Sequence, residues 1–134
     1  MNRLSPRVMT LVLVAVVATL IAGCGGGSSS STSAVTKVDA GKAVAMLDSR
    51  VVIDVRTPAE YAAGHIAGAQ NIDVEASDFA AKIASLDKKA SYLVYCRSGR
   101  RSAIAADQMA AAGFTDIVDG GGMADLVAAG APTE

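Results

Sequence analysis

The chain has 134 residues, of which 51% are hydrophobic, and its 12 basic and 13 acidic side chains give a formal net charge of −1. This length accommodates one domain of the usual ~100–200 residues. The chain has no tryptophan and no excess of positive charge, so it lacks the basic surface and the stacking platform that nucleic-acid-binding domains use. We therefore expect no nucleic-acid partner.

The N-terminal segment predicts export. Arg3 and Arg7 precede an uninterrupted apolar run over residues 8–22, which is shorter than the ~20 residues of a membrane-spanning helix and is typical of a signal peptide. The small residues directly before Cys24 resemble the lipobox of bacterial lipoproteins. This resemblance implies that residues 1–23 are removed, that Cys24 is lipidated, and that the domain is anchored at the bacterial cell membrane on its extracytoplasmic side. An ordinary signal peptide, or an uncleaved anchor, is the alternative.

Residues 24–34 are rich in glycine and serine and predict a flexible tether, so the folded domain should span residues 35–134. Removal of residues 1–23 takes away two basic residues and no acidic one, which leaves a net charge of about −3. A domain of about 100 residues is large enough for one modest hydrophobic core.

Apolar and amphipathic segments alternate along this domain. The run at 51–55 is continuous and β-branched, as in strands that are buried on both faces of a parallel sheet. Thr57, Pro58 and Glu60 form the pattern of a capping box at a helix N-terminus. In chain order we expect strands at 34–38, 51–55, 69–72, 91–96 and 116–119, and helices at 40–49, 57–64, 77–86, 102–114 and after glycines 120–122. This alternation predicts an α/β fold with a small parallel sheet of about five strands and helices on both faces.

One cysteine lies where such a fold carries its chemistry. Cys96 ends the strand at 91–96, and open parallel sheets bind ligands outside the carboxyl ends of their strands. If Cys24 is lipidated, Cys96 has no disulfide partner within its chain, and a free thiol in an exported protein suggests a reactive role. The alternative is a buried, inert cysteine.

The segment CRSGRR at the end of this strand is expected to bind anions. It is short enough to require a curled backbone, and Gly99 permits the positive φ that curling needs. Inward-turned amides, the N-terminus of a helix starting near Ser102, and the charges of Arg97, Arg100 and Arg101 all favour a thiolate over a thiol. The same features would attract a small dianion. We expect Arg101 to be exposed in this loop, where it would contribute little to stability.

Three stretches, in this order, carry a resemblance to a known family: VVIDVRTPAEYAAGHIAGAQNI, YLVYCRSGRRS and AGFTDIVDGGGMADLVAAGAP. Together they cover nearly the whole folded part, from about Val38 to Pro132. The sequence resembles a single-domain rhodanese, a thiosulfate-type sulfurtransferase. The resemblance implies a rhodanese-like fold for residues 35–134.

The resemblance also implies a mechanism, in which Cys96 attacks the outer sulfur of a small anionic donor such as thiosulfate and becomes a persulfide. The donor would be oriented by the three loop arginines, and the acceptor would be a thiol, cyanide or a protein thiol. No metal or organic cofactor is implied, because the cysteine itself carries the transferred group. The persulfide would be cradled by the backbone amides of Arg97, Ser98, Gly99, Arg100, Arg101 and Ser102.

Further positions that match the family are implied to be structural. Asp54 and Arg56 end a predicted strand and would brace the loops beside the cysteine, although Arg56 could equally pair with Glu60. His65, the single histidine of the chain, lies in a turn and would be structural rather than a general base.

The chain departs from the family pattern at two places. Leu126 stands where an aromatic residue is common, so we expect the last helix to be held less firmly. Arginines stand at both position 100 and position 101, whereas the family often has a smaller or uncharged residue at the first of the two. This difference leaves the donor preference open.

Two other functions compete with this interpretation. A cysteine phosphatase requires a C-x5-R loop, but that spacing places Ser102 where the arginine should be, and Arg101 lies one position earlier. We therefore expect the loop after Cys96 to enclose a single sulfur atom rather than a phosphate group. A module that senses or carries sulfur without turnover would keep the fold, and a carrier would use the same residues with a specific protein as acceptor.

Overall fold

A computed structural model describes residues 33–134 of the chain. The predicted signal peptide, the predicted lipidation site Cys24 and the tether up to residue 32 lie outside this range. Ala34, the last residue of the predicted tether, already takes part in the fold, because its carbonyl accepts a hydrogen bond from the Ile117 N–H at 2.8 Å. No helix within residues 33–134 is long and apolar enough to cross a membrane.

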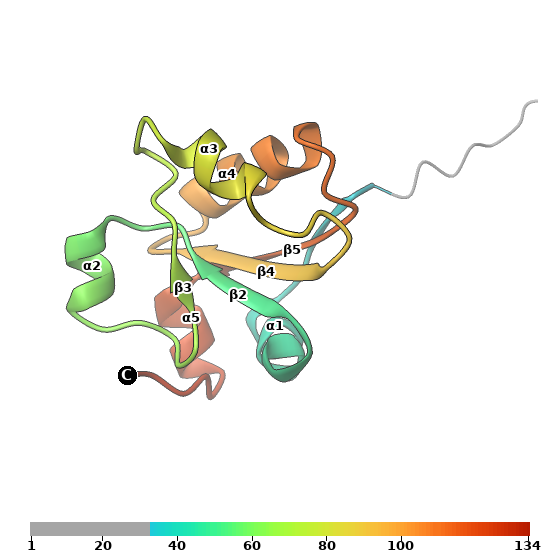
Figure 1. The fold of residues 1–134 in the computed structure, drawn as a ribbon. Coiled ribbons are helices and arrows are strands. Elements are labelled where there is room, and N and C mark those ends of the chain that lie inside the picture. Colours follow the sequence, from blue (N-terminus) through green and yellow to red (C-terminus); the bar gives the residue numbers. More distant parts are fainter. Residues whose placement is uncertain (1–32) are drawn as a thin grey trace, which may run out of the picture. The chain divides into compact units, whose positions relative to one another are not determined.

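The domain is built on one sheet of five parallel strands in the order β1-β5-β4-β2-β3 (Figure 1). The strands are β1 (Val35–Lys37), β2 (Val51–Asp54), β3 (Gln70–Asn71), β4 (Ser91–Cys96) and β5 (Asp116–Gly122). Strand β4 lies in the middle of the sheet, and every residue of it after the first is buried, which explains its continuous apolar sequence. The predicted parallel α/β fold is confirmed.

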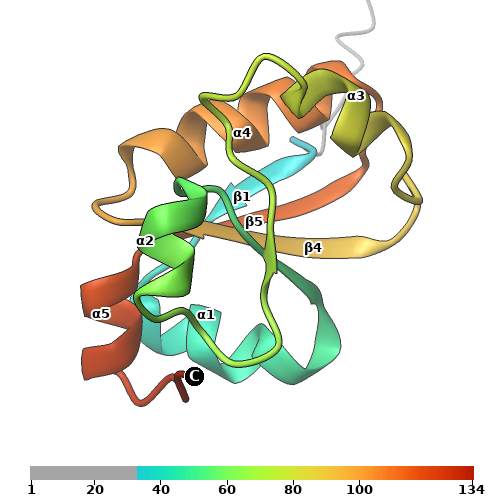
Figure 2. The same cartoon turned by 60° about the vertical axis from the view of Figure 1, so that its left-hand side comes forward.

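Helices cover both faces of the sheet. They are α1 (Ala40–Met46), which continues into a short 3-10 helix (Leu47–Ser49), α2 (Pro58–Ala62), α3 (Phe79–Ala84), α4 (Arg100–Ala111) and α5 (Met123–Ala128). In Figures 1 and 2, α3 and α4 lie on one face of the sheet, and α1 and α5 lie on the other. This is the layered arrangement that the alternating sequence pattern predicts.

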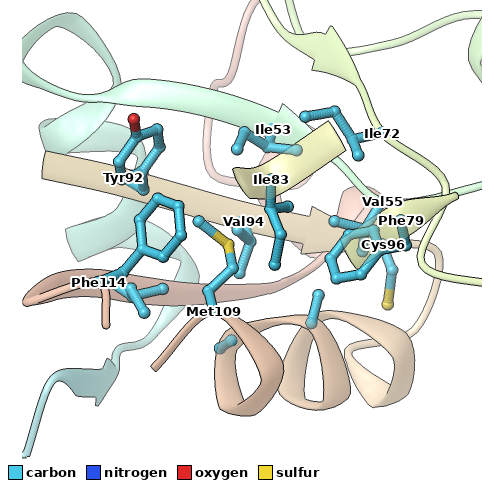
Figure 3. Packing of buried hydrophobic residues seen from close by; sticks show 13 residues of the cluster. Ile53, Val55, Ile72, Phe79, Ile83, Tyr92, Val94, Cys96, Met109 and Phe114 are labelled. Atoms are coloured by element: carbon cyan, nitrogen blue, oxygen red, sulfur yellow. The ribbon is translucent and has the colours of Figure 1, made fainter. Parts of the chain in front are cut away.

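Each face of the sheet has its own hydrophobic core. The core beneath α3 and α4 includes Phe79, Met109 and Phe114, and Cys96 lies at its edge (Figure 3). The core beneath α1 and α5 contains Leu126, whose side chain is fully buried. Leu126 therefore anchors α5 at the position where the family often carries an aromatic residue.

Local sequence signals explain two of the helix N-termini. The capping box that the sequence predicts at α2 is present: the Thr57 hydroxyl accepts from the Glu60 N–H at 3.3 Å, and the Glu60 carboxylate accepts from the Thr57 N–H at 3.2 Å. At α1, the Asp39 carboxylate accepts from the Lys42 N–H at 2.9 Å. Both caps satisfy amides that a helix leaves without partners in its first turn.

Several element boundaries differ from the sequence-based expectation by one to three residues, and two of these differences bear on the site. Helix α4 begins at Arg100 rather than near Ser102, because Gly99 adopts a left-handed conformation (φ +92°) and forms the N-cap. Strand β5 continues to Gly122 instead of ending at Asp119, so glycines 120–122 belong to the strand rather than only leading into α5. Close packing leaves little room for a side chain at Gly120, since a Cβ there would lie 3.0 Å from Cδ2 of Leu93.

Candidate active site

The sulfur of Cys96 lies at the carboxyl end of β4, the place that the fold predicts for a reactive group. The residue is fully buried, and in Figure 3 its sulfur points toward the start of α4. The Gly99 N–H donates to Sγ at 2.9 Å. Because Gly99 is the N-cap of the 12-residue helix α4, the sulfur meets both a backbone donor and the positive end of a helix dipole.

A second polar contact holds the sulfur from the helix side. The Cys96 thiol donates to the Ser102 hydroxyl at 3.7 Å, and that hydroxyl donates to the Gly99 carbonyl at 3.0 Å. Ser102 is fully buried, so this chain of contacts is sheltered from water. The loop between strand and helix is only residues 97–99, which is shorter than the sequence indicated, and the first turn of α4 forms the rest of the cradle.

The three loop arginines differ in whether their side chains form ion pairs, and Arg101 is the one that does. It forms a bidentate ion pair with Glu60, with Nη1–Oε2 and Nη2–Oε1 distances of 2.7 and 2.8 Å, and Nη1 also lies 3.3 Å from Glu75. The hydrogen bonds between the two side chains raise the pKa of Arg101 and lower the pKa of Glu60 to about 2. The expectation that Arg101 is exposed is wrong, since its side chain is 19% exposed.

Arg97 and Arg100 differ from Arg101. Both are exposed, and within residues 33–134 neither side chain makes an ion pair or a hydrogen bond to another residue. Their charges are therefore available to a ligand, whereas the charge of Arg101 is compensated. The geometry makes Arg101 a positioning residue that ties the start of α4 to α2, and leaves Arg97 and Arg100 as the arginines that could bind an anionic donor.

Asp54 and Arg56 form a buried pair beside the loop. The Arg56 Nη2 and Nε atoms donate to the Asp54 carboxylate at 2.6 to 3.0 Å, and Nη2 also donates to the Gly64 carbonyl at 2.7 Å. The hydrogen bond to Asp54 raises the pKa of Arg56. Arg56 thus pairs with Asp54, and the alternative pairing with Glu60 is not found, because Glu60 is held by Arg101.

Tyr95 connects this pair to the rest of the sheet edge. Its hydroxyl donates to Asp54 Oδ2 at 2.7 Å and accepts from the Ile66 N–H at 2.9 Å. Burial raises the pKa of Tyr95, so the hydroxyl keeps its proton and remains a donor to the carboxylate. The network joins β2, β4 and the turn at residue 66 into one rigid support.

His65 lies in that turn, and its contacts are structural. Its ring stacks on Tyr61 with centroids 3.7 Å apart, and its Nδ1 is 3.0 Å from the Tyr61 carbonyl. Its Nε2 lies 3.4 Å from the Glu134 carboxylate, and the two residues exchange two backbone hydrogen bonds of 2.9 Å. All of these partners lie away from the Cys96 loop in the sequence, and none of them is part of it.

The glycines at the end of β5 support the loop, a role that the sequence reasoning missed. A Cβ on Gly122 would lie 2.8 Å from the Arg97 carbonyl oxygen and 3.3 Å from Ser98 Cα. Gly121 has φ +81°, and the pairing of β4 with β5 shifts register between Val94 and Cys96. A run of three glycines at the end of a strand was the available signal, since glycine in a strand often marks a bulge or a close backbone approach.

Three hollows open around this loop, and Cys96 lines none of them. The first, of about 930 Å³, lies between the loop, the β5 glycines and the segment from the end of β1 to the start of α1, and it includes Lys37, Asp39 and Arg100. The second, of about 270 Å³, lies between α4, at Ile104, and the segment before α3, at Glu75. The third, of about 520 Å³, lies between Arg97 and α5.

Comparison with known families matches residues 39–125 to the Rhodanese-like domain, a range that contains the cysteine loop and its supports. The chain belongs to this family. Among its curated relatives, it is 43% identical over 74 residues to the thiosulfate sulfurtransferase GlpE of Pseudomonas fluorescens, a match that covers 53% of this chain and 65% of the relative. It is 35% identical over 74 residues to the thiosulfate sulfurtransferase PspE of Escherichia coli, covering 55% of this chain and 71% of the relative. The first match thus spans less than two thirds of that relative's length.

Solved structures agree with this assignment of the rhodanese-like fold. The Rhodanese-like domain of an Anabaena protein is 30% identical, with a TM-score of 0.66 and coverage of 73% of this chain and 77% of that one. A structure described as rhodanese with anions from Escherichia coli is 32% identical, with a TM-score of 0.55 and coverage of 63% and 96%.

Proposed function

We propose that this rhodanese-like domain is a sulfurtransferase that moves a sulfane sulfur from a small anionic donor to a thiophilic acceptor through Cys96. The single observation that carries the proposal is the 2.9 Å hydrogen bond from the Gly99 N–H to Sγ at the N-terminus of α4. A backbone donor and a helix dipole both stabilise a negatively charged sulfur more than a neutral one.

The proposed reaction needs no external oxidant or reductant. The Cys96 thiolate attacks the outer sulfur of thiosulfate, the S–S bond of the donor breaks, and sulfite leaves with the bonding electron pair. The persulfide on Cys96 keeps one negative charge, which the amide of Gly99 and the first turn of α4 face. Cyanide or a thiolate then attacks the terminal sulfur and restores the Cys96 thiolate.

The charges around the loop fit an anionic donor. Arg97 and Arg100 are exposed and unpaired within residues 33–134, and a charge-assisted hydrogen bond is stronger than a neutral one. The names of the curated relatives, and the anions described for the solved Escherichia coli rhodanese, support a donor of the thiosulfate class.

The phosphatase alternative loses support at Arg101. In that mechanism the loop arginine must be free to bind the phosphate, but here both terminal nitrogens of Arg101 are engaged by Glu60. The alternative of a sulfur carrier differs from the enzyme in its acceptor, so a turnover assay separates the two.

The test is steady-state formation of thiocyanate from thiosulfate and cyanide by the purified chain, with Cys96→Ser as the matched variant. The wild type should turn over many times, and Cys96→Ser should give no thiocyanate above the uncatalysed rate. A single stoichiometric burst without turnover would favour the carrier, and hydrolysis of aryl phosphates without thiocyanate would favour the phosphatase.

We also propose that the protein is exported and held at the membrane by lipid on Cys24. The support is the sequence alone, namely the apolar run at 8–22, the small residues before Cys24 and the tether that follows. Stable anchoring requires more than one acyl chain, because a single chain binds membranes marginally. Processing should be blocked by globomycin, and Cys24→Ser should yield protein without acyl chains. Acyl chains on that variant would rule out the proposed site.

A further inference from the structure

Asp119 is a buried carboxylate that the proposed reaction does not use. It lies in β5 and is 2% exposed, and within residues 33–134 it has no ion-pair partner. The other buried carboxylate in this part of the chain, Asp54, is compensated by Arg56 at 2.6 Å. Lys37 lies opposite Asp119 in the register of β1 and β5, but it is exposed and forms no ion pair with it. Because burial of a charge without an ion-pair partner costs stability, packing alone does not explain this residue.

The neighbours of Asp119 in β5 are apolar and alternate between the two cores. Ile117 packs in the core beneath α3 and α4, and Val118 packs in the core beneath α1 and α5. Because successive side chains of a strand point to opposite faces, Asp119 lies on the same face as Ile117. Cys96, on the neighbouring strand β4, also belongs to the core on that face. The carboxylate and the reactive sulfur therefore lie on one side of the sheet.

The Asp119 carboxylate binds an amide where the pairing of β4 with β5 is irregular. Between Val94 and Cys96, two residue steps in β4 correspond to three in β5, from Asp119 to Gly122. Such a bulge leaves an extra residue outside the regular ladder of strand hydrogen bonds. Asp119 Oδ1 accepts a hydrogen bond from the Gly121 N–H at 3.1 Å. The side chain thus supplies a partner to an amide inside the bulge.

Gly121 belongs to the backbone on which the cysteine loop rests. It has φ +81°, and a Cβ on Gly99 would lie 3.5 Å from the Gly121 Cα. The Gly99 N–H in turn donates to Sγ of Cys96 at 2.9 Å. A short series of contacts therefore joins the Asp119 carboxylate to the reactive sulfur.

We propose that Asp119 is a positioning residue for sulfur transfer, which fixes Gly121 in the bulge and thereby holds the Gly99 amide against Sγ. This inference rests on the proposed sulfurtransferase function and adds to it a residue that does not itself contact the sulfur. The useful feature of Asp119 is the hydrogen bond that it accepts, since a nearby negative charge would disfavour a thiolate. An uncharged side chain with an oxygen in the same place should therefore replace it.

The test compares Asp119→Asn with Asp119→Leu in the purified full chain. Both replacements are uncharged and similar in size, but only asparagine keeps an oxygen acceptor for the Gly121 amide. The readout is the rate constant for alkylation of Cys96 by iodoacetamide at pH 6, followed by mass spectrometry of the Cys96 peptide, because this rate depends on the fraction of thiolate.

Asp119→Asn should keep the wild-type alkylation rate or exceed it. Asp119→Leu should be about tenfold slower than Asp119→Asn, which corresponds to the loss of one hydrogen bond to a charged group. Turnover of thiosulfate should fall by the same factor in Asp119→Leu, mainly in kcat, because Arg97 and Arg100 remain available to the donor.

Asp87→Leu is the matched control. Asp87 Oδ1 accepts from the Lys89 N–H at 2.9 Å in the same two-residue arrangement, but this turn precedes β4, at the opposite end of the strand from Cys96. The control should leave the alkylation rate unchanged.

A measurement without variants covers the case in which Asp119→Leu does not fold. In the wild type, the Gly121 amide should exchange with deuterium about tenfold or more slowly than the Lys89 amide, because its acceptor is buried whereas Asp87 is exposed. Exchange of the two amides at equal rates would overturn the inference, because the hydrogen bond to Asp119 would then not persist in solution.

Equal alkylation rates in Asp119→Asn and Asp119→Leu, or an equal loss in Asp87→Leu, also overturn the inference. Alkylation needs no sulfur donor, so the outcome is separate from that of the proposed function. If the wild type forms no thiocyanate, the proposed function fails and the alkylation rates still decide whether Asp119 positions the loop. If thiocyanate is formed and the alkylation rates are equal, only the role of Asp119 fails.

Discussion

The segments that follow β2 and β4 begin side by side at one edge of the sheet, since Asp54 pairs with Tyr95 in the register of the two strands. At the end of β2, the charges are buried and compensated, with Asp54 and Arg56 joined at 2.6 Å. After β4, Arg97 and Arg100 are exposed and have no side-chain partner within residues 33–134. The difference indicates that the first segment holds the edge in place and that the second leaves positive charge for a ligand.

The two segments are also linked to each other. Glu60 completes the capping box of α2, and its carboxylate also accepts hydrogen bonds from both terminal nitrogens of Arg101, in the first turn of α4. One carboxylate therefore fixes two helix starts. We expect substitutions in the compensated network to change stability first, and substitutions of the free arginines to change donor use first.

The largest effect is expected from Asp54→Asn. This change removes the charge that compensates the buried Arg56, and breaking a buried ion pair costs about 3–5 kcal/mol. Urea unfolding should report this loss in the free energy of unfolding. Asp78→Asn is the control, because Asp78 pairs with Lys82 at the surface, where both side chains are at least half exposed, and such pairs contribute about 0–1 kcal/mol. Equal losses for the two variants would mean that the Asp54–Arg56 network is not a support.

Gly122→Ala should come next. The added Cβ would lie 2.8 Å from the Arg97 carbonyl oxygen, and because this neighbour is backbone, the loop must move. A displacement of about 1 Å at a reacting group can reduce the rate about 100-fold, so thiocyanate formation should fall by this order, with a stability loss of about 1–3 kcal/mol.

Gly41→Ala is the matched control for that substitution. Gly41 lies in α1, where the added Cβ would come no nearer than 3.4 Å to Asp39 Oδ1. Alanine is favoured over glycine inside a helix by about 0.5–1 kcal/mol, so this variant should keep its activity and its stability. Full activity in Gly122→Ala would show that the β5 glycines do not set the shape of the loop.

Arg101→Ala and Arg97→Ala should separate stability from donor use. Arg101→Ala leaves the part-buried Glu60 without its ion pair and should cost about 1–3 kcal/mol in urea unfolding. Arg97→Ala should leave stability within about 0.5 kcal/mol but raise the KM for thiosulfate about tenfold, as the loss of one charge-assisted hydrogen bond to the donor would. The reverse pattern, with Arg101→Ala stable and Arg97→Ala unfolded, would contradict the division between the arginines.

The smallest expected effect is the change in stability at acidic pH. The hydrogen bonds from Arg101 lower the pKa of Glu60 from 4.5 to about 2 in the folded protein. A carboxylate whose pKa is lower when folded stabilises the fold above its unfolded pKa and loses that contribution as the pH falls toward the folded value. The thermal midpoint of Glu60→Gln should therefore lie below that of the wild type near pH 6, and the two should converge between about pH 4.5 and 2. A gap that stays constant with pH would show that Glu60 acts through its shape alone.

Most of the fold could be predicted from the sequence, because its signals are local. The β-branched run at 51–55 and the Thr57–Glu60 capping box depend on neighbouring residues, and both were found where expected. The sequence predicts too early an end for β5, because glycine has low strand propensity. The strand continues to Gly122 through close packing against Leu93 and the loop.

The site could be predicted only in part, because some of its contacts join residues that are far apart in the sequence. The position of Cys96 after a buried strand followed from the order of elements. The pairing of Arg101 with Glu60 joins residues 41 apart in the chain, and Glu60 already had a local role in the capping box. Nothing in the sequence separated Arg101 from Arg97 and Arg100, since the distinction arises from how α2 and α4 approach each other.

The most direct test of the proposed chemistry is the intact mass of the protein after incubation with thiosulfate. Wild-type protein should gain the mass of one sulfur atom, peptide mapping should place it on Cys96, and cyanide should remove it with formation of thiocyanate. Cys96→Ser should gain nothing. A wild-type protein that turns over donor but never carries this sulfur on Cys96 would contradict the persulfide mechanism.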